Sequence, residues 1–148
     1  MKKLCIGLIA VTFMLLPFMT GCSAAEEEIV EIREQFFMRQ TQYILRNLDE
    51  FTGRTIRLEG VFLGWEDPTP AGNTYYFVMR FFADCCGDDG GSLGFELQMG
   101  NFEPFEDDAW VEVTGVLELQ DSWQPNNPVL VVTAIEEMDT RGQAFVMP

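Results

Sequence analysis

Between residues 29 and 53 the apolar side chains recur at steps of three and four residues, the spacing of one face of an α-helix. This apolar stripe consists of Ile29, Ile32, Phe36, Ile44 and Leu48, and it is widened by Phe37 and Leu45. Asn47, Asp49 and Gly53 follow in the positions expected at a helix end. The pattern therefore predicts one helix over residues 29–53.

From Thr55 onward the period of the apolar residues changes to two, which indicates β-strands. Turn-rich stretches separate five such segments, namely 55–62, 74–84, 93–99, 111–119 and 129–138. The second segment is apolar on both faces, with Tyr75, Phe77, Met79 and Phe81 on one side and Tyr76, Val78 and Phe82 on the other. In the fourth, Val111, Val113, Leu117 and Leu119 are expected to point inward. Gly60 and Gly115 lie in mid-strand, where glycine marks a bulge or a sharp bend.

Five short strands after one helix favour a mainly β fold, a small five-stranded barrel of the OB type preceded by an N-terminal helix. A two-sheet sandwich is the main alternative, but sandwiches normally contain seven or more strands. The expected organisation is a helix over 29–53 and an OB-like β-barrel domain over 54–148.

The residues before this domain have the features of an export signal. Lys2 and Lys3 precede an apolar run over residues 4–19, which is followed by Thr20-Gly21-Cys22. This stretch resembles a bacterial lipoprotein signal, in which cleavage occurs before the cysteine and the thiol carries a diacylglycerol. The resemblance implies a signal peptide over 1–21, lipidation of Cys22 with palmitate-type chains, and an acidic spacer over 22–28. An ordinary signal peptide with an incidental cysteine is the alternative.

Removal of the signal leaves seven arginines, no lysine and no histidine against 24 acidic residues, a formal net charge of −17. Nucleic-acid binding needs a basic surface, so no nucleic-acid partner is expected. Absence of histidine excludes Ser-His-Asp and Cys-His mechanisms, and we expect no enzymatic activity. Attachment to the extracytoplasmic face of the cell membrane would then depend on the lipid, because anionic headgroups repel so acidic a chain.

Two segments resemble the C-terminal domain of the YcgQ-like permease-subunit family. They are Arg80-Phe81-Phe82-Ala83-Asp84-Cys85-Cys86-Gly87-Asp88-Asp89 and Asp108-Ala109-Trp110-Val111-Glu112-Val113-Thr114-Gly115. The likeness extends from about Leu45 to Pro148 and implies an OB-like extracytoplasmic domain that partners a permease with several membrane spans. Two departures stand out. Family members carry N-terminal membrane helices where this chain has a lipid anchor, and Gly87 replaces the residue usual after the cysteine pair.

Cys85 and Cys86 are the two cysteines left once Cys5 is removed with the signal and Cys22 is lipidated. A vicinal thiol pair suits a soft metal or metalloid ion, with Asp84, Asp88 or Asp89 as oxygen ligands. Alternatively the pair acts as a redox switch, or the acidic loop alone holds Ca²⁺, although its spacing differs from the EF-hand pattern. A purely structural interpretation is equally open, with one cysteine packed in the core and the other idle or in a strained bridge.

Aromatic residues and one arginine complete the candidates. Trp65, Tyr75, Tyr76, Trp110 and Trp123 either form a stacking surface for sugars or peptides, or pack in the core and at the barrel rim. Arg80 lies among apolar neighbours, and we expect it to pair with Asp84 or Glu96 in a structural role.

These observations favour a lipid-anchored OB-fold accessory protein that works beside a membrane permease and presents an ion through Cys85 and Cys86. A thiol-disulfide redox protein of the cell envelope is the second hypothesis. It is weakened because the chain lacks a Cys-X-X-Cys motif and lacks lysine or histidine to stabilise a thiolate. A module that binds envelope polymers is the third hypothesis, and it depends on fold analogy alone.

Overall fold

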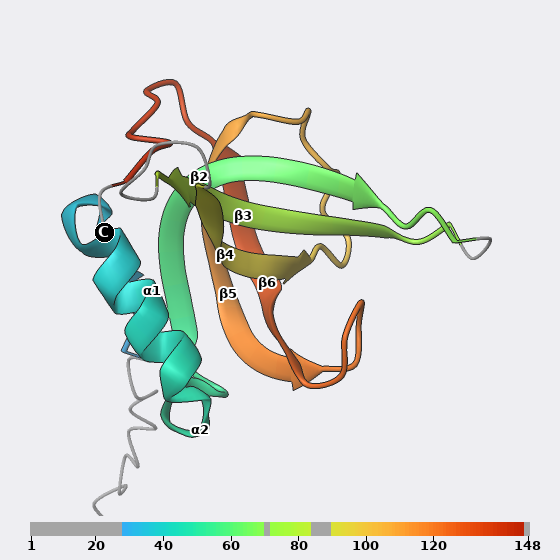
Figure 1. The fold of residues 1–148 in the computed structure, drawn as a ribbon, viewed down its shortest axis with the longest axis horizontal. Coiled ribbons are helices and arrows are strands. Elements are labelled where there is room, and N and C mark those ends of the chain that lie inside the picture. The colour runs from blue at the N-terminus through green and yellow to red at the C-terminus, as the bar shows by residue number, and fades with distance from the viewer. Residues whose placement is uncertain (1–27, 70–71, 84–89, 147–148) are drawn as a thin grey trace, which may run out of the picture.

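The structure is a computed structural model that describes residues 28–69, 72–83 and 90–146. A short strand and a helical segment come first, followed by five long strands (Figure 1). The elements are β1 (Val30–Ile32), a 3-10 turn (Glu34–Phe36), α1 (Phe37–Arg46), α2 (Leu48–Phe51), β2 (Thr55–Glu66), β3 (Thr74–Phe82), β4 (Gly91–Gln98), β5 (Trp110–Gln120) and β6 (Asn127–Glu137). The five predicted strands are all present.

The five long strands form a closed barrel. Their order in the sheet is β2-β3-β4-β6-β5, and pairing of β2 with β5 closes the ring. Four of the five interfaces are antiparallel, whereas β4 and β6 run parallel through Glu96–Gln98 and Val129–Val131. The short β1 adds a parallel sixth strand to β2. The prediction of a small OB-like barrel with a preceding helix is confirmed.

The predicted helix over 29–53 was too long at its N-terminal end. Residues 30–32 form β1 instead, with Val30 opposite Ile56 and Ile32 opposite Leu58 of β2. Val30 and Ile32 are β-branched and fit a pleated surface better than a helix. Pairing with β2 therefore overrides the helical spacing of these residues, and the α-helix begins only at Phe37.

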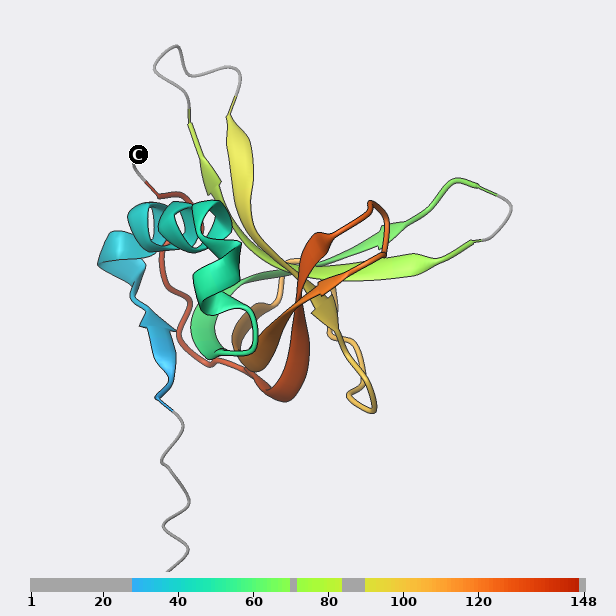
Figure 2. The ribbon, with the colours of Figure 1, turned by 90° about the horizontal axis from the view of Figure 1, so that it is seen from below.

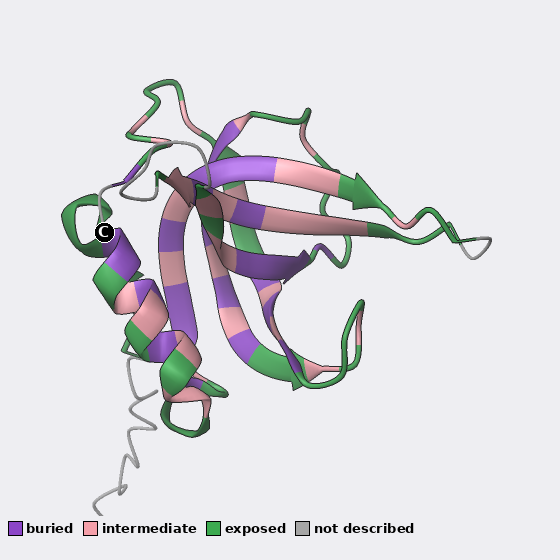
Figure 3. Cartoon of the chain, viewed as in Figure 1, coloured by how far each residue is buried: buried purple, intermediate pink, exposed green. Residues whose placement is uncertain are grey.

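The helical segment and the barrel share one core. Phe37 and Ile44 of α1 and Phe51 of α2 pack in the same apolar cluster as Leu58, Val78 and other inward residues of the strands. Purple bands on alternate positions of the strands in Figure 3 show this inner face. Leu119, which was predicted to point inward, is 40% exposed. It lies near the end of β5, where the strand continues past the core to the β5–β6 turn.

Both mid-strand glycines lie where the barrel turns. At Gly115 the β5–β6 register shifts, as a bulge requires. Gly60 lies where β2 changes partner from β5 to β3, and β2 curves there in Figure 1. A Cβ atom on Gly60 would lie 2.9 Å from the carbonyl oxygen of Met79, so any side chain would push the two strands apart. The expectation of bulges or bends at these positions is confirmed.

Candidate functional site

The cysteine motif belongs to the connection between β3 and β4. Asp84, Cys85, Cys86, Asp88 and Asp89 lie outside the described residues, as does Cys22. The described base of this connection is the pair Phe82 and Gly91, opposite each other at the ends of the two strands. Figure 2 shows that the β3–β4 and β2–β3 hairpins project from the barrel in different directions.

Beside this base is a surface pocket of about 370 Å³ that contains exposed aromatic surface. Phe81, Phe82, Ser92 and Phe145 contribute side chains to its lining. Among the described residues no group of three or more cysteine, aspartate or glutamate side chains is placed to hold a metal ion.

Arg80 is the largest fully buried side chain of the described part of the protein, with 1% exposure. Its guanidinium donates from Nε to the carbonyl oxygen of Glu59 at 3.0 Å and from Nη1 to that of Gln143 at 3.2 Å. Its acidic partner is Glu34, with 3.6 Å between Nη1 and Oε1. Burial lowers the pKa of Arg80, and the negative charges of Glu34 and Glu59 oppose this shift. An arginine remains protonated under such conditions.

The prediction that Arg80 pairs with Glu96 was wrong. The alternative partner, Asp84, lies outside the described residues. The reason is the direction of the side chains on the two strands. Arg80 lies opposite Leu93 on the inward side, whereas Glu96 is engaged by the β5–β6 turn. The predicted structural role of Arg80 agrees with its contacts, because they join the N-terminal segment, β2 and the C-terminal tail.

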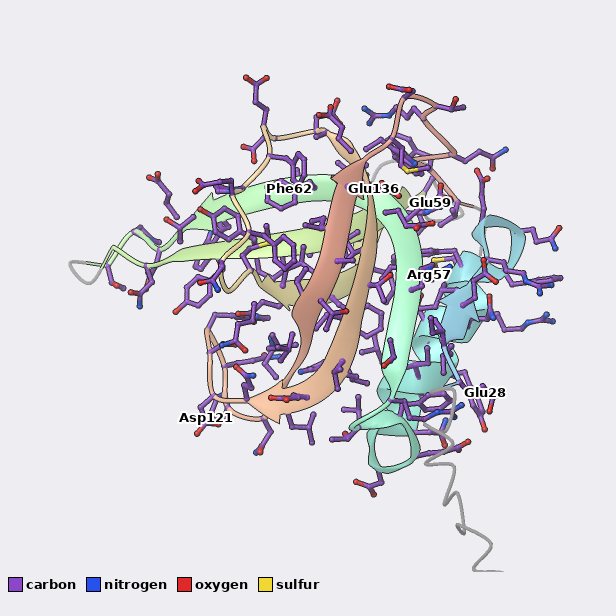
Figure 4. All side chains as sticks on the ribbon, turned by 180° about the vertical axis from the view of Figure 1, so that it is seen from behind. Glu28, Arg57, Glu59, Phe62, Asp121 and Glu136 are labelled. Atoms are coloured by element: carbon purple, nitrogen blue, oxygen red, sulfur yellow. The ribbon has the colours of Figure 1, made fainter. Side chains whose placement is uncertain are left out.

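Two aromatic rings lie close to the Arg80 guanidinium. Its central carbon lies 4.9 Å from the ring centre of Phe37 and 4.8 Å from that of Trp110, within cation–π range. Trp110 in turn donates from Nε1 to Glu59 Oε2 at 3.2 Å. Glu59, which is labelled in Figure 4, lies on β2. We name Arg80, Glu34, Glu59, Phe37 and Trp110 the arginine clamp.

Glu96 forms a second buried polar group at the base of the β5–β6 turn. Its Oε2 accepts hydrogen bonds from Ser122 Oγ at 2.6 Å and from Asn127 Nδ2. Gln124 Nε2 donates to Asn127 Oδ1 at 2.8 Å and extends the network into the turn. These bonds satisfy the buried carboxylate and hold in place the turn that carries Trp123, which is half exposed.

The aromatic candidates separate into two groups. Tyr76 stacks on Phe62 in the core, with 5.5 Å between ring centres, and Trp110 is buried in the clamp. Trp65 stacks on Tyr75 on the outer face, at 5.8 Å, and both are accessible. For Tyr76 and Trp110 the packing alternative is therefore correct, whereas Trp65 and Trp123 lie at the surface.

An outward row of side chains follows β3. Tyr75, Phe77, Met79 and Phe81 alternate with the inward residues and are each partly exposed. One end of the row is the Trp65–Tyr75 stack, and the other is Phe81, whose ring centre lies 5.7 Å from that of Phe145. We name Trp65, Tyr75, Phe77, Met79, Phe81 and Phe145 the aromatic row. Its stacked rings suit flat apolar or aromatic groups of a binding partner.

Sequence patterns did not reveal the role of the C-terminal tail. Phe81 N–H donates to the carbonyl oxygen of Ala144, and Val146 N–H donates to that of Phe81, both at 2.8 Å. Gln143 N–H donates to Glu34 Oε1 at 2.6 Å. Arg141 forms a bidentate pair with Asp108, at 2.7 and 3.0 Å, and this pair lowers the pKa of Asp108. The tail thus covers β3 where β2 has turned away.

A membrane-spanning helix is not found in the part of the chain that the structure describes.

The family model of the DUF1980 C-terminal domain matches residues 19–148. The chain belongs to the DUF1980 C-terminal domain family. This membership agrees with the resemblance to the YcgQ-like family, and it covers the arginine clamp and the aromatic row.

Further comparisons add little to this DUF1980 assignment. No curated protein matches the sequence. A solved structure, the second OB-fold domain of replication protein A from Methanococcus maripaludis, matches at 17% identity and covers 63% of this chain and 90% of its own. Its TM-score is 0.29, too low to support an argument about fold or ligand.

Proposed function

We propose that this DUF1980 domain is a lipid-anchored, non-enzymatic accessory protein on the extracytoplasmic face of the cell membrane, where it binds a multi-span permease. The observation that carries the proposal is the distance along the chain between the two parts. A lipoprotein-type cysteine at position 22 precedes the first strand at Val30 by only eight residues. A tether this short keeps the OB-like barrel next to whatever membrane protein it serves.

The aromatic row is the surface that best fits a protein partner. It combines stacked and partly exposed aromatic rings with Met79, the residue types enriched in the cores of protein interfaces. Acidic residues, among them Glu66 and Asp67, lie at the tip of the β2–β3 hairpin next to Trp65. A partner segment with apolar side chains and positive charge would complement this surface.

Site-specific crosslinking in membranes tests the partner. With photoreactive benzoylphenylalanine in place of Phe77, in the middle of the row, we expect crosslinks to an integral membrane protein. The same group at Thr133, an exposed position of β6, is the control and is expected to give none. Equal crosslinking from both positions, or from neither, would contradict the assignment of the aromatic row.

The proposal extends to an ion held by Cys85 and Cys86 with Asp84 or Asp88, as the chemistry of vicinal thiols suggests. In native mass spectrometry of the reduced protein we expect one soft metal ion per chain. Cys85→Ser with Cys86→Ser is expected to abolish its binding, because serine replaces both thiolates. Asp88→Asn is the milder comparison and is expected to weaken binding only partly. Equal metal content in the wild type and the cysteine variant would exclude the ion role.

A further inference from the structure

The positive charges of the mature chain are concentrated in its N-terminal segment. Residues 29–54 contain four of its seven arginines and four acidic residues, so the segment is neutral. Residues 55–148 contain three arginines and 17 acidic residues. Within the segment, α1 has Arg39 and Arg46 and no acidic residue. The segment that contains α1 is therefore neutral and has exposed arginines, although Glu26, Glu27 and Glu28 precede it, whereas the barrel has a charge of −14.

These arginines lie on the outer side of α1 together with aromatic rings. Phe36, Arg39, Tyr43 and Arg46 are all exposed, and their spacing of three and four residues places them on one helix face. Phe37, Thr41 and Ile44 are buried and form the opposite face against the barrel. We name Phe36, Arg39, Tyr43 and Arg46 the α1 face.

Arginine and aromatic groups are in contact on and beside this face. The Arg39 guanidinium lies 4.8 Å from the ring centre of Phe36, and Tyr43, which is 54% exposed, contacts Phe51 edge-on. Arg54 lies 5.1 Å from the ring centre of Phe51. Two nearby acids are engaged, since Glu34 pairs with Arg80 and Glu50 accepts a hydrogen bond from the Tyr43 hydroxyl. Arg39 and Arg46 are themselves exposed, as are the nearby Glu31 and Asp49.

The place where the tether enters is close to this face. Eight residues span at most about 29 Å, so Val30 lies within that distance of a lipidated Cys22. In Figure 4 Glu28 lies beside the helical segment, whereas Asp121 and Glu136 lie on the barrel away from it. A tether that enters at β1 therefore keeps the helical segment within reach of the membrane.

We infer that the α1 face rests on the headgroup layer of the anionic membrane and orients the barrel away from it. Tyrosine and phenylalanine favour the membrane interface, and arginines near an anionic surface are attracted to it. Repulsion of the barrel by the same lipids acts in the same direction. This inference rests on the proposed lipid anchor, and it leaves the aromatic row free for the permease.

Paramagnetic relaxation tests the orientation. The full lipidated protein is placed in nanodiscs of equal parts phosphatidylcholine and phosphatidylglycerol with a gadolinium-chelate headgroup lipid. We expect the amide signals of α1 to be broadened strongly and the indole signals of Trp65 and Trp123 weakly. Each arginine close to an anionic surface contributes about a fivefold preference, so Arg39→Gln with Arg46→Gln should reduce the excess of this orientation about 25-fold.

Matched charge variants and the mass of the acylated chain distinguish the possible outcomes of this experiment. Arg46→Gln is expected to reduce the preference about fivefold, whereas Arg57→Gln, the same charge change on β2, should leave it unchanged. Equal broadening of the α1 amide signals and the indole signals in a lipidated protein would overturn the proposed orientation but not the proposed lipid anchor. The same broadening pattern in nanodiscs of phosphatidylcholine alone would also overturn it, because the attraction of the arginines requires anionic lipid. A mass without acyl chains on Cys22 would overturn the proposed function together with the tether.

Discussion

Replacing Arg80 with methionine is expected to lower the free energy of unfolding by about 3 kcal/mol. Methionine keeps much of the apolar volume but removes the donors to the carbonyl oxygens of Glu59 and Gln143 and both cation–π contacts. The loss should appear in urea unfolding of the mature domain. It should also accelerate hydrogen exchange at the amides of Phe81 and Val146, because the tail loses one of its attachments, the bond from Arg80 to Gln143.

Two further variants are the comparisons for Arg80→Met. Arg57→Met removes an arginine that is partly exposed and lies 4.0 Å from Glu112, and it should lower the free energy of unfolding by less than about 1 kcal/mol. The loss in the free energy of unfolding for Arg80→Lys should lie between those of the two methionine variants, since an ammonium cannot stack as a planar guanidinium does. If Arg80→Met were as stable as Arg57→Met, the arginine clamp would not be what holds the tail and the helical segment to the barrel.

Removing the acyl chains is expected to release the protein from the membrane almost completely. Each buried methylene contributes about 0.8 kcal/mol, and a single myristoyl chain alone gives a partition constant of about 10⁴ M⁻¹. A form exported behind an ordinary cleavable signal, with alanine in place of Cys22, should be recovered in the soluble fraction of the cell envelope.

A variant that loses charge but keeps Cys22 is the control for this release experiment. Arg39→Gln with Arg46→Gln keeps Cys22 and is expected to remain in the membrane fraction, because the α1 face orients the domain and does not anchor it. Quantitative recovery of the unlipidated form with membranes at high salt would show that a protein contact, and not the lipid, holds the domain there.

The barrel was predictable because side chains in most of its strands alternate between two environments, and turn-rich stretches also mark the limits of the 74–84 segment, which is apolar on both faces. The start of the helix was not, since Ile32 fits both the helical stripe and a strand, and the choice depends on pairing with β2, 26 residues further along. Leu119 continues the alternation of β5 beyond the core, which no local pattern can reveal.

The candidate site was less predictable because its contacts join distant segments. Glu34 and Gln143, which surround Arg80, lie 46 residues before it and 63 after it, and only the path of the tail brings them together. Trp65 and Trp110 both lie outside the apolar core cluster, yet only Trp110 is buried. Trp110 is buried because Arg80 and Arg141 cover it, and a Cβ on Gly142 would lie 2.7 Å from its ring.

The intact mass of the protein extracted from membranes tests the tethered barrel most directly. We expect a chain that begins at Cys22 and carries a diacylglyceryl group on its thiol, so that its mass exceeds that of residues 22–148 by the mass of these lipids. A chain that begins elsewhere, or one that begins at Cys22 with a free thiol, would contradict the account.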